Sequence, residues 1–247
     1  MEEALNEFIE YWKSKKYVIG ILLTGSYAVG LQNENSDIDI RIIFNNTKKK
    51  TIKGLSIING FKFSYLGSSI NATTIKLNVD FLNYNKFEAR IYSIGKILYT
   101  KNKGLESLIT LAKIYLNTPF IKKKIEENDL KTKLYTLYSY KNHLLESDEK
   151  SPFFIYNYYI YMKFTLNTYS QFLGYEFFLD VKTENVLFNQ KYRILYIWSD
   201  YPDPKFINLW KENLETKNVN KHSVQKINDY IEKKIEKINE DNFKIFW

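Results

Sequence analysis

Residues 21–44 read ILLTGSYAVGLQNENSDIDIRIIF. The apolar run over residues 17–24 leads into Gly25-Ser26, and its near-continuous apolar character predicts a strand that is buried on both faces. After a short polar loop, residues 37–44 alternate between polar and apolar side chains, as is typical of a strand with one buried face. Because successive side chains of a strand point to opposite faces, we expect Asp37, Asp39 and Arg41 to share one face and the intervening isoleucines to enter the core.

Two carboxylates side by side on a rigid strand repel each other, and such a pair is typical of a site for a divalent cation. Carboxylate oxygens suit Mg²⁺, which takes one or two of them and completes its coordination with waters and substrate phosphates. Gly25 allows the backbone to approach a ligand closely, and Ser26 offers a hydroxyl and an N–H at the following turn. The stretch therefore predicts a phosphate site assisted by a metal.

The order of these pieces resembles the polymerase-β-type nucleotidyltransferase superfamily. Its signature is a Gly-Ser pair, a spacer and a strand in which two Asp residues alternate with hydrophobic ones. Here the spacer is residues 27–36, and the strand begins Asp37-Ile38-Asp39-Ile40. The form is similar to that of the small bacterial and viral members and of the antibiotic-type enzymes. Strand, turn, spacer and alternating strand all occur in order, so the match is more specific than any one piece.

The resemblance implies a third carboxylate on a neighbouring strand, and Asp80 fits that place. Residues 73–84 read TTIKLNVDFLNY, a stretch rich in β-branched and aromatic residues that predicts a strand. An acid among apolar strand residues is costly unless it is paired or binds a metal. A helical pattern over residues 86–94 and then Gly95-Lys96-Ile97-Leu98-Tyr99 resemble the end of such domains. Glu88 is the rival for the third acid, but we expect it on a helix surface.

The composition is that of a globular protein, with 45% hydrophobic residues and a net charge of +8. The charge suits a nucleic acid or a polyphosphate, but an AT-rich coding sequence accounts for it equally well. The absence of Cys excludes disulfides, thiolate zinc sites and a cysteine nucleophile. The acidic start MEEALNEF is unlike a signal peptide, and the apolar runs are too short to cross a bilayer. We therefore expect a cytoplasmic protein without a membrane partner.

The rest of the chain divides into two patterns. Residues 2–15 predict an amphipathic helix, and Asn59-Gly60 predicts a hairpin between strands at 51–59 and 60–66. After Tyr99 the pattern is helical, over residues 104–117, 119–128, 130–147, 152–174, 184–199, 203–217 and 223–239. The expected fold class is thus an α/β (α+β) nucleotidyltransferase domain with a mixed sheet, followed by an all-helical domain. The domain boundaries are placed at residues 1–102 and 103–247.

Residues 152–174 are apolar or aromatic almost all round, which predicts the central helix of the second domain. Lys163 lies within this run and must reach water, an acid or a phosphate. The resemblance implies that a basic residue of the helical domain contacts the triphosphate, so Lys163 is a candidate, with Lys141 a second one.

The expected reaction follows from the resemblance. A nucleoside monophosphate, AMP from ATP by analogy with the family, is moved to an acceptor hydroxyl on a small molecule or protein, and pyrophosphate is released. Alternatives are an RNA-directed terminal nucleotidyltransferase and a non-catalytic scaffold with this fold. Mg²⁺ or Mn²⁺ is expected as cofactor. The implied metal ligands and catalytic residues are Asp37, Asp39 and Asp80, and the implied nucleotide-binding residues are Gly25, Ser26, Arg41 and Lys163.

Overall fold

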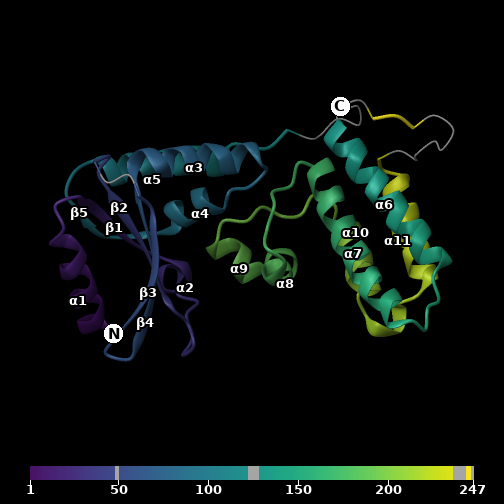
Figure 1. Cartoon of the computed structure of the whole chain (residues 1–247), viewed down its shortest axis with the longest axis horizontal. Coiled ribbons are helices and arrows are strands. Elements are labelled where there is room, and N and C mark those ends of the chain that lie inside the picture. The colour runs from purple at the N-terminus through teal and green to yellow at the C-terminus, as the bar shows by residue number, and fades with distance from the viewer. Residues whose placement is uncertain (48–49, 122–127, 236–242, 246–247) are drawn as a thin grey trace. The chain divides into compact units, whose positions relative to one another are not determined.

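The computed structural model describes residues 1–47, 50–121, 128–235 and 243–245. Its elements are shown in Figure 1. In chain order they are α1 (Glu2–Lys13), β1 (Val18–Thr24), α2 (Gly25–Val29), β2 (Ile38–Phe44), β3 (Ile52–Ile58), β4 (Phe61–Ser69), α3 (Ile70–Leu82), α4 (Phe87–Ile94), β5 (Lys96–Thr100), α5 (Gly104–Asn117), α6 (Asn128–Glu146), α7 (Pro152–Phe172), the 3₁₀ turn η1 (Asp180–Lys182), α8 (Thr183–Phe188), α9 (Gln190–Leu195), α10 (Pro204–Asn213), the 3₁₀ turn η2 (Thr216–Asn218) and α11 (Lys221–Glu232).

The five strands found in the described residues form one mixed sheet in the order β3-β4-β2-β1-β5. β2 runs parallel to β4, and every other neighbouring pair is antiparallel. A helical region follows the sheet along the chain. The predicted architecture, an α/β (α+β) domain with a mixed sheet followed by a helical domain, is therefore confirmed.

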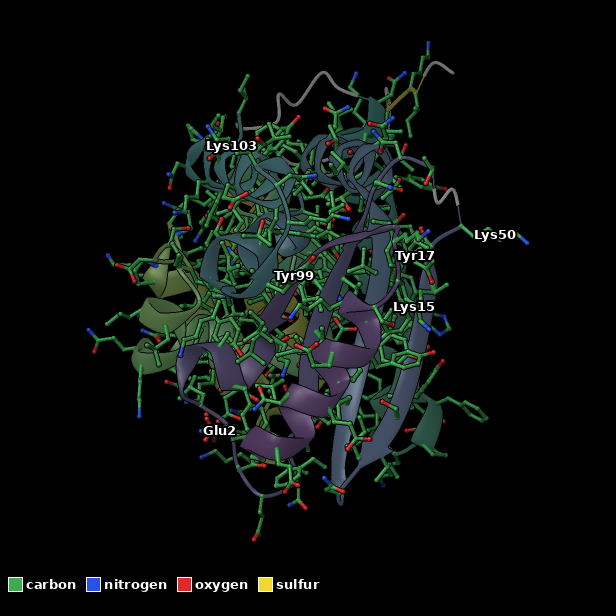
Figure 2. All side chains as sticks on the ribbon, turned by 90° about the vertical axis from the view of Figure 1, so that its left-hand side faces the viewer. Glu2, Lys15, Tyr17, Lys50, Tyr99 and Lys103 are labelled. Carbon is green, nitrogen blue, oxygen red and sulfur yellow. The ribbon has the colours of Figure 1, made fainter. Side chains whose placement is uncertain are left out.

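Helices cover both faces of the sheet. On one face Phe8 and Trp12 of α1 pack with Ile38 and Ile40 of β2, as the alternation of β2 predicts. Figure 2 shows α1 in front of the sheet, with the labelled Tyr17 and Tyr99 beside it. On the other face α3, α4 and α5 form a second core that includes Ile43 of β2. β1 is buried along nearly its whole length, as predicted, because both layers cover it.

The hairpin signal at Asn59-Gly60 is confirmed. Asn59 and Gly60 have φ values of 49° and 81°, and two positive φ values suit the turn of a two-residue hairpin. β3 and β4 pair in antiparallel register from this turn, with Ile58 opposite Phe61. The turn therefore fixes the register in which β4 reaches β2.

The strand predicted over residues 73–84 is wrong, because this segment lies in helix α3. The side chain of Ser69 caps the helix by accepting a hydrogen bond from the Ala72 backbone N–H at 3.2 Å. Thr73, Leu77 and Asp80 are buried at helical spacing along one side. The apolar residues between them are largely exposed.

The chain folds into two compact units, and their limits differ from the predicted boundary near residue 102. The first unit contains Met1–Pro119 and also Phe188–Trp198, and the second contains Phe120–Leu187 and Ser199–Trp247. α5 belongs to the first unit because its buried leucines pack in the same core as residues of α3 and α4. The segment at 188–198 returns from the helical region to this unit.

Within the second unit α7 is the central helix, as predicted. Tyr158, Tyr161 and Tyr169 on this helix are each almost completely buried. The indole N–H of Trp210 donates a hydrogen bond of 2.7 Å to the carbonyl of Met162. These three tyrosines of α7 therefore belong to the core of the second unit.

Several of the predicted helices differ in extent. The helix expected at 203–217 ends at Asn213 in α10, and the 3₁₀ turn η2 follows it. The helix expected at 184–199 is interrupted at Asn189, whose side chain caps α9. Residues 119–121 are not helical, and the rest of the helix expected at 119–128 lies largely outside the described residues. The helix expected at 223–239 is observed as α11, which begins at Lys221 and ends at Glu232; residues 233–235 are not helical, and residues 236–239 lie outside the described part. No helix in the described ranges is long and apolar enough to cross a membrane.

Candidate active site

Asp39 lies near the beginning of β2, the central strand of the sheet. In the β-ladder Asp39 stands between Thr24 of β1 and Ser64 of β4. The hydroxyl of Thr24 donates a hydrogen bond of 3.1 Å to the backbone carbonyl of Asp39. Asp37 lies just before β2, and 34% of its side chain is exposed. Because the flanking Ile38 and Ile40 are buried, Asp37 and Asp39 lie on the opposite face from α1.

The Gly-Ser turn packs directly against Asp39. Gly25 has a φ of 64°, and a Cβ at this position would overlap Asp39 Oδ2 and lie 3.0 Å from Asp39 Cβ. Only glycine combines this backbone conformation with so close an approach. Ser26 is the next residue, in the first turn of the short helix α2. The turn and the acid pair are therefore parts of one site, although residues 27–36 separate them in the sequence.

Arg41 follows Asp39 on the same face of β2 and is held by an ion pair with Glu88. Its Nη2 lies 3.0 Å from Oε1 of Glu88 on α4, and only 15% of the Arg41 side chain and 8% of the Glu88 side chain are exposed. The expectation that Glu88 lies on a helix surface is therefore wrong. The pairing with Arg41 explains how this acid is accommodated in the interior, since buried charges need a partner.

The structure does not bring Asp80 together with Asp37 and Asp39. Asp80 lies on α3 with 5% of its surface exposed, and its Oδ1 accepts a hydrogen bond of 2.6 Å from Lys76 Nζ one turn earlier. Across the described residues, no group of three or more Asp, Glu, His or Cys side chains is placed to hold a metal ion. The predicted strand with a third acid is absent because the segment is helical.

Of the two strands that neighbour the acid pair, β4 carries a cation. Ser64 is opposite Asp39 in the parallel register, and Phe63 is opposite Ile38 in the core. By alternation, Lys62 and Ser64 lie on the face of the carboxylates. Lys62 Nζ is 3.2 Å from Asp37 Oδ2. Lys62 was not among the predicted site residues, because the resemblance implied an acid on the neighbouring strand and Asp80 was assigned to that place.

A second missed feature is the segment at 188–198. Arg90 of α4 donates a hydrogen bond of 2.7 Å from Nε to the carbonyl of Tyr196, and its guanidinium lies 3.6 Å from the centroid of the Trp198 ring. The rings of Tyr192 and Tyr196 stack with centroids 4.4 Å apart. Burial raises the pKa of Tyr196 to about 12, with smaller contributions from Tyr192 and from the negative charge of Asp39. Tyr196 is thus close enough to Asp39 to feel its charge.

One sequence signal for this arrangement was available. The chain has 36 basic residues, and the only arginines are Arg41, Arg90 and Arg193. Arg41 and Arg90 both make buried pairings, for which the planar, multidentate guanidinium is better suited than an ammonium group.

Lys163 belongs to the second unit. Its Nζ lies 2.6 Å from Oδ2 of Asp180, and both side chains are more than half exposed. Lys141, the other lysine considered, has its Nζ 3.8 Å from Glu232 Oε1. The structure therefore pairs both lysines with acids of their own unit.

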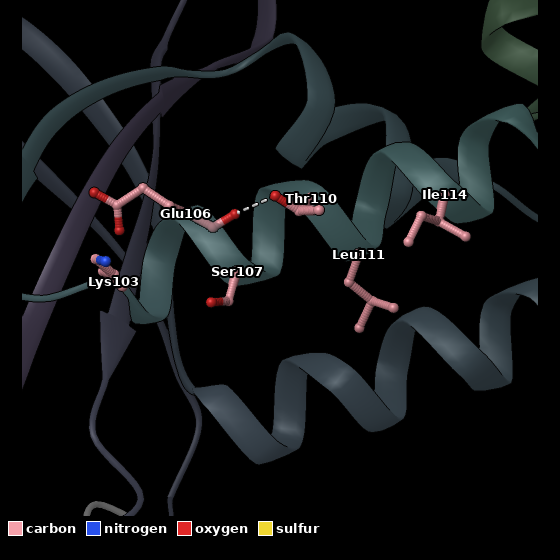
Figure 3. A pocket seen from close by; sticks show the side chains of 6 residues that line it. All are labelled: Lys103, Glu106, Ser107, Thr110, Leu111 and Ile114. Atoms are coloured by element: carbon pink, nitrogen blue, oxygen red, sulfur yellow. Dashed lines mark hydrogen bonds between the residues drawn. The ribbon is translucent and has the colours of Figure 1, made fainter.

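An open pocket of about 590 Å³ lies along α5 (Figure 3). All of the residues that line it come from α5 and its N-terminal flank: Lys103, Glu106, Ser107, Thr110, Leu111 and Ile114. The hydroxyl of Thr110 donates a hydrogen bond of 2.9 Å to the carbonyl of Glu106 one turn earlier, as the dashed line in Figure 3 marks. None of the predicted site residues lines this pocket, so it is separate from the acid pair.

The donor set at the acid pair suits one hard cation. Asp37 and Asp39 offer carboxylate oxygens from one strand face, and Asp37 is open to solvent. Mg²⁺ is typically bound by one or two carboxylates together with substrate phosphates, and Mn²⁺ accepts the same ligands. The residues present therefore fit a divalent cation that is shared with a phosphate ligand.

Comparison with known proteins shows the family to which the chain belongs. No curated protein matches the chain. Among solved structures, a nucleotidyltransferase-like protein from Exiguobacterium sibiricum 255-15 is 12% identical, with a TM-score of 0.49, over 95% of this chain and 75% of that chain. The nucleotidyltransferase-domain family matches residues 5–128, a range that includes Gly25, Ser26, Asp37 and Asp39. Because this match spans half of the 247 residues, the chain belongs to the nucleotidyltransferase-domain family.

Proposed function

We propose that the chain transfers AMP from ATP to an acceptor hydroxyl on a small molecule or a protein, with a divalent cation bound and with release of pyrophosphate. The observation that carries this proposal is the approach of the Gly25 backbone to the Asp39 carboxylate, within the region that matches the family. This contact joins a turn suited to phosphate with a pair of acids suited to a cation. The choice of AMP follows the family resemblance.

Asp37 and Asp39 hold the cation through their carboxylates in this proposal. A bound Mg²⁺ or Mn²⁺ supplies charge neutralisation for the triphosphate and orients its oxygens. Ser26 donates its hydroxyl to a phosphate oxygen, and Gly25 leaves room for that phosphate beside Asp39. Arg41 contributes positive charge to the site, and its ion pair with Glu88 fixes its position.

The transfer is an in-line displacement at the α-phosphorus. The acceptor oxygen forms a bond to phosphorus, and the bond from phosphorus to the oxygen that bridges to the β-phosphate breaks. That oxygen leaves with the electron pair as part of pyrophosphate, and the proton of the acceptor hydroxyl passes to solvent. The residues contribute by holding the reactants in line and by stabilising charge, which are the dominant effects in phosphoryl transfer.

Lys163 is proposed as a further contact to the triphosphate. Its ion pair with Asp180 is exposed and therefore weak, so a more highly charged ligand can compete for the ammonium group. The variant K163Q tests this role. We expect it to raise the KM for ATP several-fold, whereas an unchanged KM would assign Lys163 to its surface pair with Asp180.

The first experiment measures pyrophosphate release from each of the four nucleoside triphosphates with Mg²⁺ or Mn²⁺. It is run without acceptor, with short RNA and with a panel of small hydroxyl compounds and proteins, and D37A serves as the blank. Release from ATP with a small molecule or protein supports the proposal. Absence of release under every condition, despite nucleotide binding, would overturn it in favour of a scaffold.

An RNA-directed terminal transferase is the second candidate. The net charge of +8 favours it, because a basic protein attracts the phosphate backbone. Release that requires RNA and declines steeply with salt would establish this alternative.

A further inference from the structure

Lys62 occupies the position on β4 that lies beside the acid pair. β2 and β4 are parallel neighbours, and Phe63 faces Ile38 within the core beneath α1. Phe63 is completely buried, so the side chains before and after it must emerge on the opposite face. That face is the one on which Asp37 and Asp39 lie.

The ammonium group of Lys62 is already engaged with the site. Its Nζ lies 3.2 Å from Asp37 Oδ2, and 51% of the Lys62 side chain remains exposed. Its neighbour on the edge strand is Ile57, which is 75% exposed, so β3 leaves this side of Lys62 open. A lysine with a flexible four-carbon stem can move by several ångströms at such a position without any change in the backbone.

The number of acidic ligands limits how many cations the site can hold. Two divalent cations in one phosphoryl-transfer site lie roughly 3.5–4 Å apart and need enough carboxylates to bridge and flank them. Within the described residues the site contains two acids, Asp37 and Asp39, and no cluster of three. Asp80, the acid expected to complete a second cation site, pairs with Lys76 on α3.

We propose that Lys62 supplies the positive charge that a second cation would otherwise bring, so that this chain acts with one divalent cation and one ammonium group. The inference rests on the proposed nucleotidyl transfer and specifies its metal requirement. Once a cation and a nucleotide are bound, Asp37 turns to the cation and Lys62 Nζ is released toward the phosphate oxygens. Its three N–H donors are suited to oxygens that gain negative charge during transfer.

The test counts Mn²⁺ ions by titration calorimetry and electron paramagnetic resonance, with α,β-methylene ATP as a nucleotide that cannot be cleaved at the α-phosphorus. We expect one Mn²⁺ per bound nucleotide in the wild-type protein and in K62Q. In K62D, which places a third carboxylate beside the pair, we expect a second Mn²⁺. In the absence of nucleotide, K62Q is expected to bind Mn²⁺ about tenfold more tightly, since the competing ammonium group is gone from Asp37.

Turnover provides the second readout. K62Q is expected to lower kcat about 100-fold, as for the loss of a group that stabilises transition-state charge. The matched control is K53Q, because Lys53 lies on the same face of the neighbouring strand β3, opposite Leu66. K53Q should change neither the Mn²⁺ count nor kcat.

Two Mn²⁺ ions in the wild-type complex would overturn the role of Lys62 and leave the proposed transfer intact. Unchanged kcat in K62Q would overturn it as well. If the wild-type protein binds neither the nucleotide nor Mn²⁺, the proposed function fails, and this inference fails with it.

Discussion

The carboxylate of Asp39 packs so closely against the backbone of Gly25 that any side chain at residue 25 would overlap Asp39 Oδ2. The positive φ of 64° at Gly25 independently disfavours every other residue. The Gly-Ser signature of this family thus has a steric reason in this chain. A substitution at residue 25 must displace the acid on which the proposed cation site depends.

We therefore expect G25A to abolish turnover and weaken Mn²⁺ binding by at least tenfold. The left-handed backbone alone costs about 1–2 kcal/mol for alanine. Gly30 is the matched control, because its φ is 73° and nothing lies within 4 Å of a Cβ placed there. G30A should carry only the backbone cost and keep its affinity for Mn²⁺. Calorimetric titration of both variants tests this, and equal loss in both would refute the steric argument.

Asp39→Asn should separate function from stability. The amide keeps the shape of the side chain but removes the charge that a cation requires, so we expect kcat to fall at least about 100-fold. The free energy of unfolding should change by less than about 0.5 kcal/mol or rise, because repulsion with Asp37 is relieved. Glu7→Gln on the exposed side of α1 is the control for the change in charge. A loss of several kcal/mol in D39N would show that the acids are structural.

Glu88→Gln tests whether Arg41 is structural. Removing the charge of Glu88 leaves a buried guanidinium without its ionic partner, which typically costs about 3–5 kcal/mol. Urea denaturation should show this loss, and the double variant R41M/E88L should recover most of it. If the stability of E88Q is that of the wild type, Arg41 is not held by Glu88.

Alkaline pH should destabilise the protein through its buried tyrosines. Burial raises the pKa of Tyr158 to about 12, and burial together with Tyr192 and Asp39 raises that of Tyr196 to about 12. An unfolded tyrosine loses its proton near pH 10, whereas these residues keep theirs in the folded state. The free energy of unfolding is therefore constant below pH 10 as far as these groups are concerned, and it falls between pH 10 and 12. Denaturation at half-unit pH steps measures it, and a flat profile over that range would contradict the burial of these hydroxyls.

Arg90→Lys should loosen the segment at 188–198. Lysine cannot reproduce both the hydrogen bond to the Tyr196 carbonyl and the stacking on Trp198. We expect amide hydrogen exchange in this segment to accelerate at least tenfold, while exchange in β1 and β2 is unchanged. K191Q, at an exposed residue of α9, is the control. Unaltered exchange in R90K would mean that other contacts hold the segment.

The elements that were predicted correctly are those whose signals are local. Ile38–Arg41 of β2 alternate because one face meets α1 while Asp39 and Arg41 occupy the other, and Asn59-Gly60 suits the two positive φ values of the hairpin. Such patterns depend only on neighbours in the sequence. The prediction of a site at the acid pair and the Gly-Ser turn depends on the same kind of local pattern.

α3 was predicted incorrectly because its sequence carries two periods. Residues 75–81 read IKLNVDF and alternate like a strand, and Ile75 and Val79 are in fact exposed at 63% and 44%. The period that decides the structure is that of Thr73, Leu77 and Asp80, which enter the core. The cap at Ser69 and the packing of α3 against α5 together outweigh the β-propensity of the individual residues.

The contacts of Arg90 could not be predicted from sequence patterns between near neighbours. Arg90 and Tyr196 are separated by 106 positions, and no periodicity links them. Lys62 was missed for a related reason, because the register of β4 against β2 follows from a hairpin and a crossover and not from either strand alone.

The return of Phe188–Trp198 to the first unit has a consequence for synthesis of the chain. A ribosome delivers residues in order, so the sheet and α4 emerge long before their last partner. Until Trp198 has been made, the Arg90 side chain lacks the carbonyl and the ring that receive it. During translation the first unit therefore lacks the segment at 188–198 until residues 120–187 of the second unit have been made.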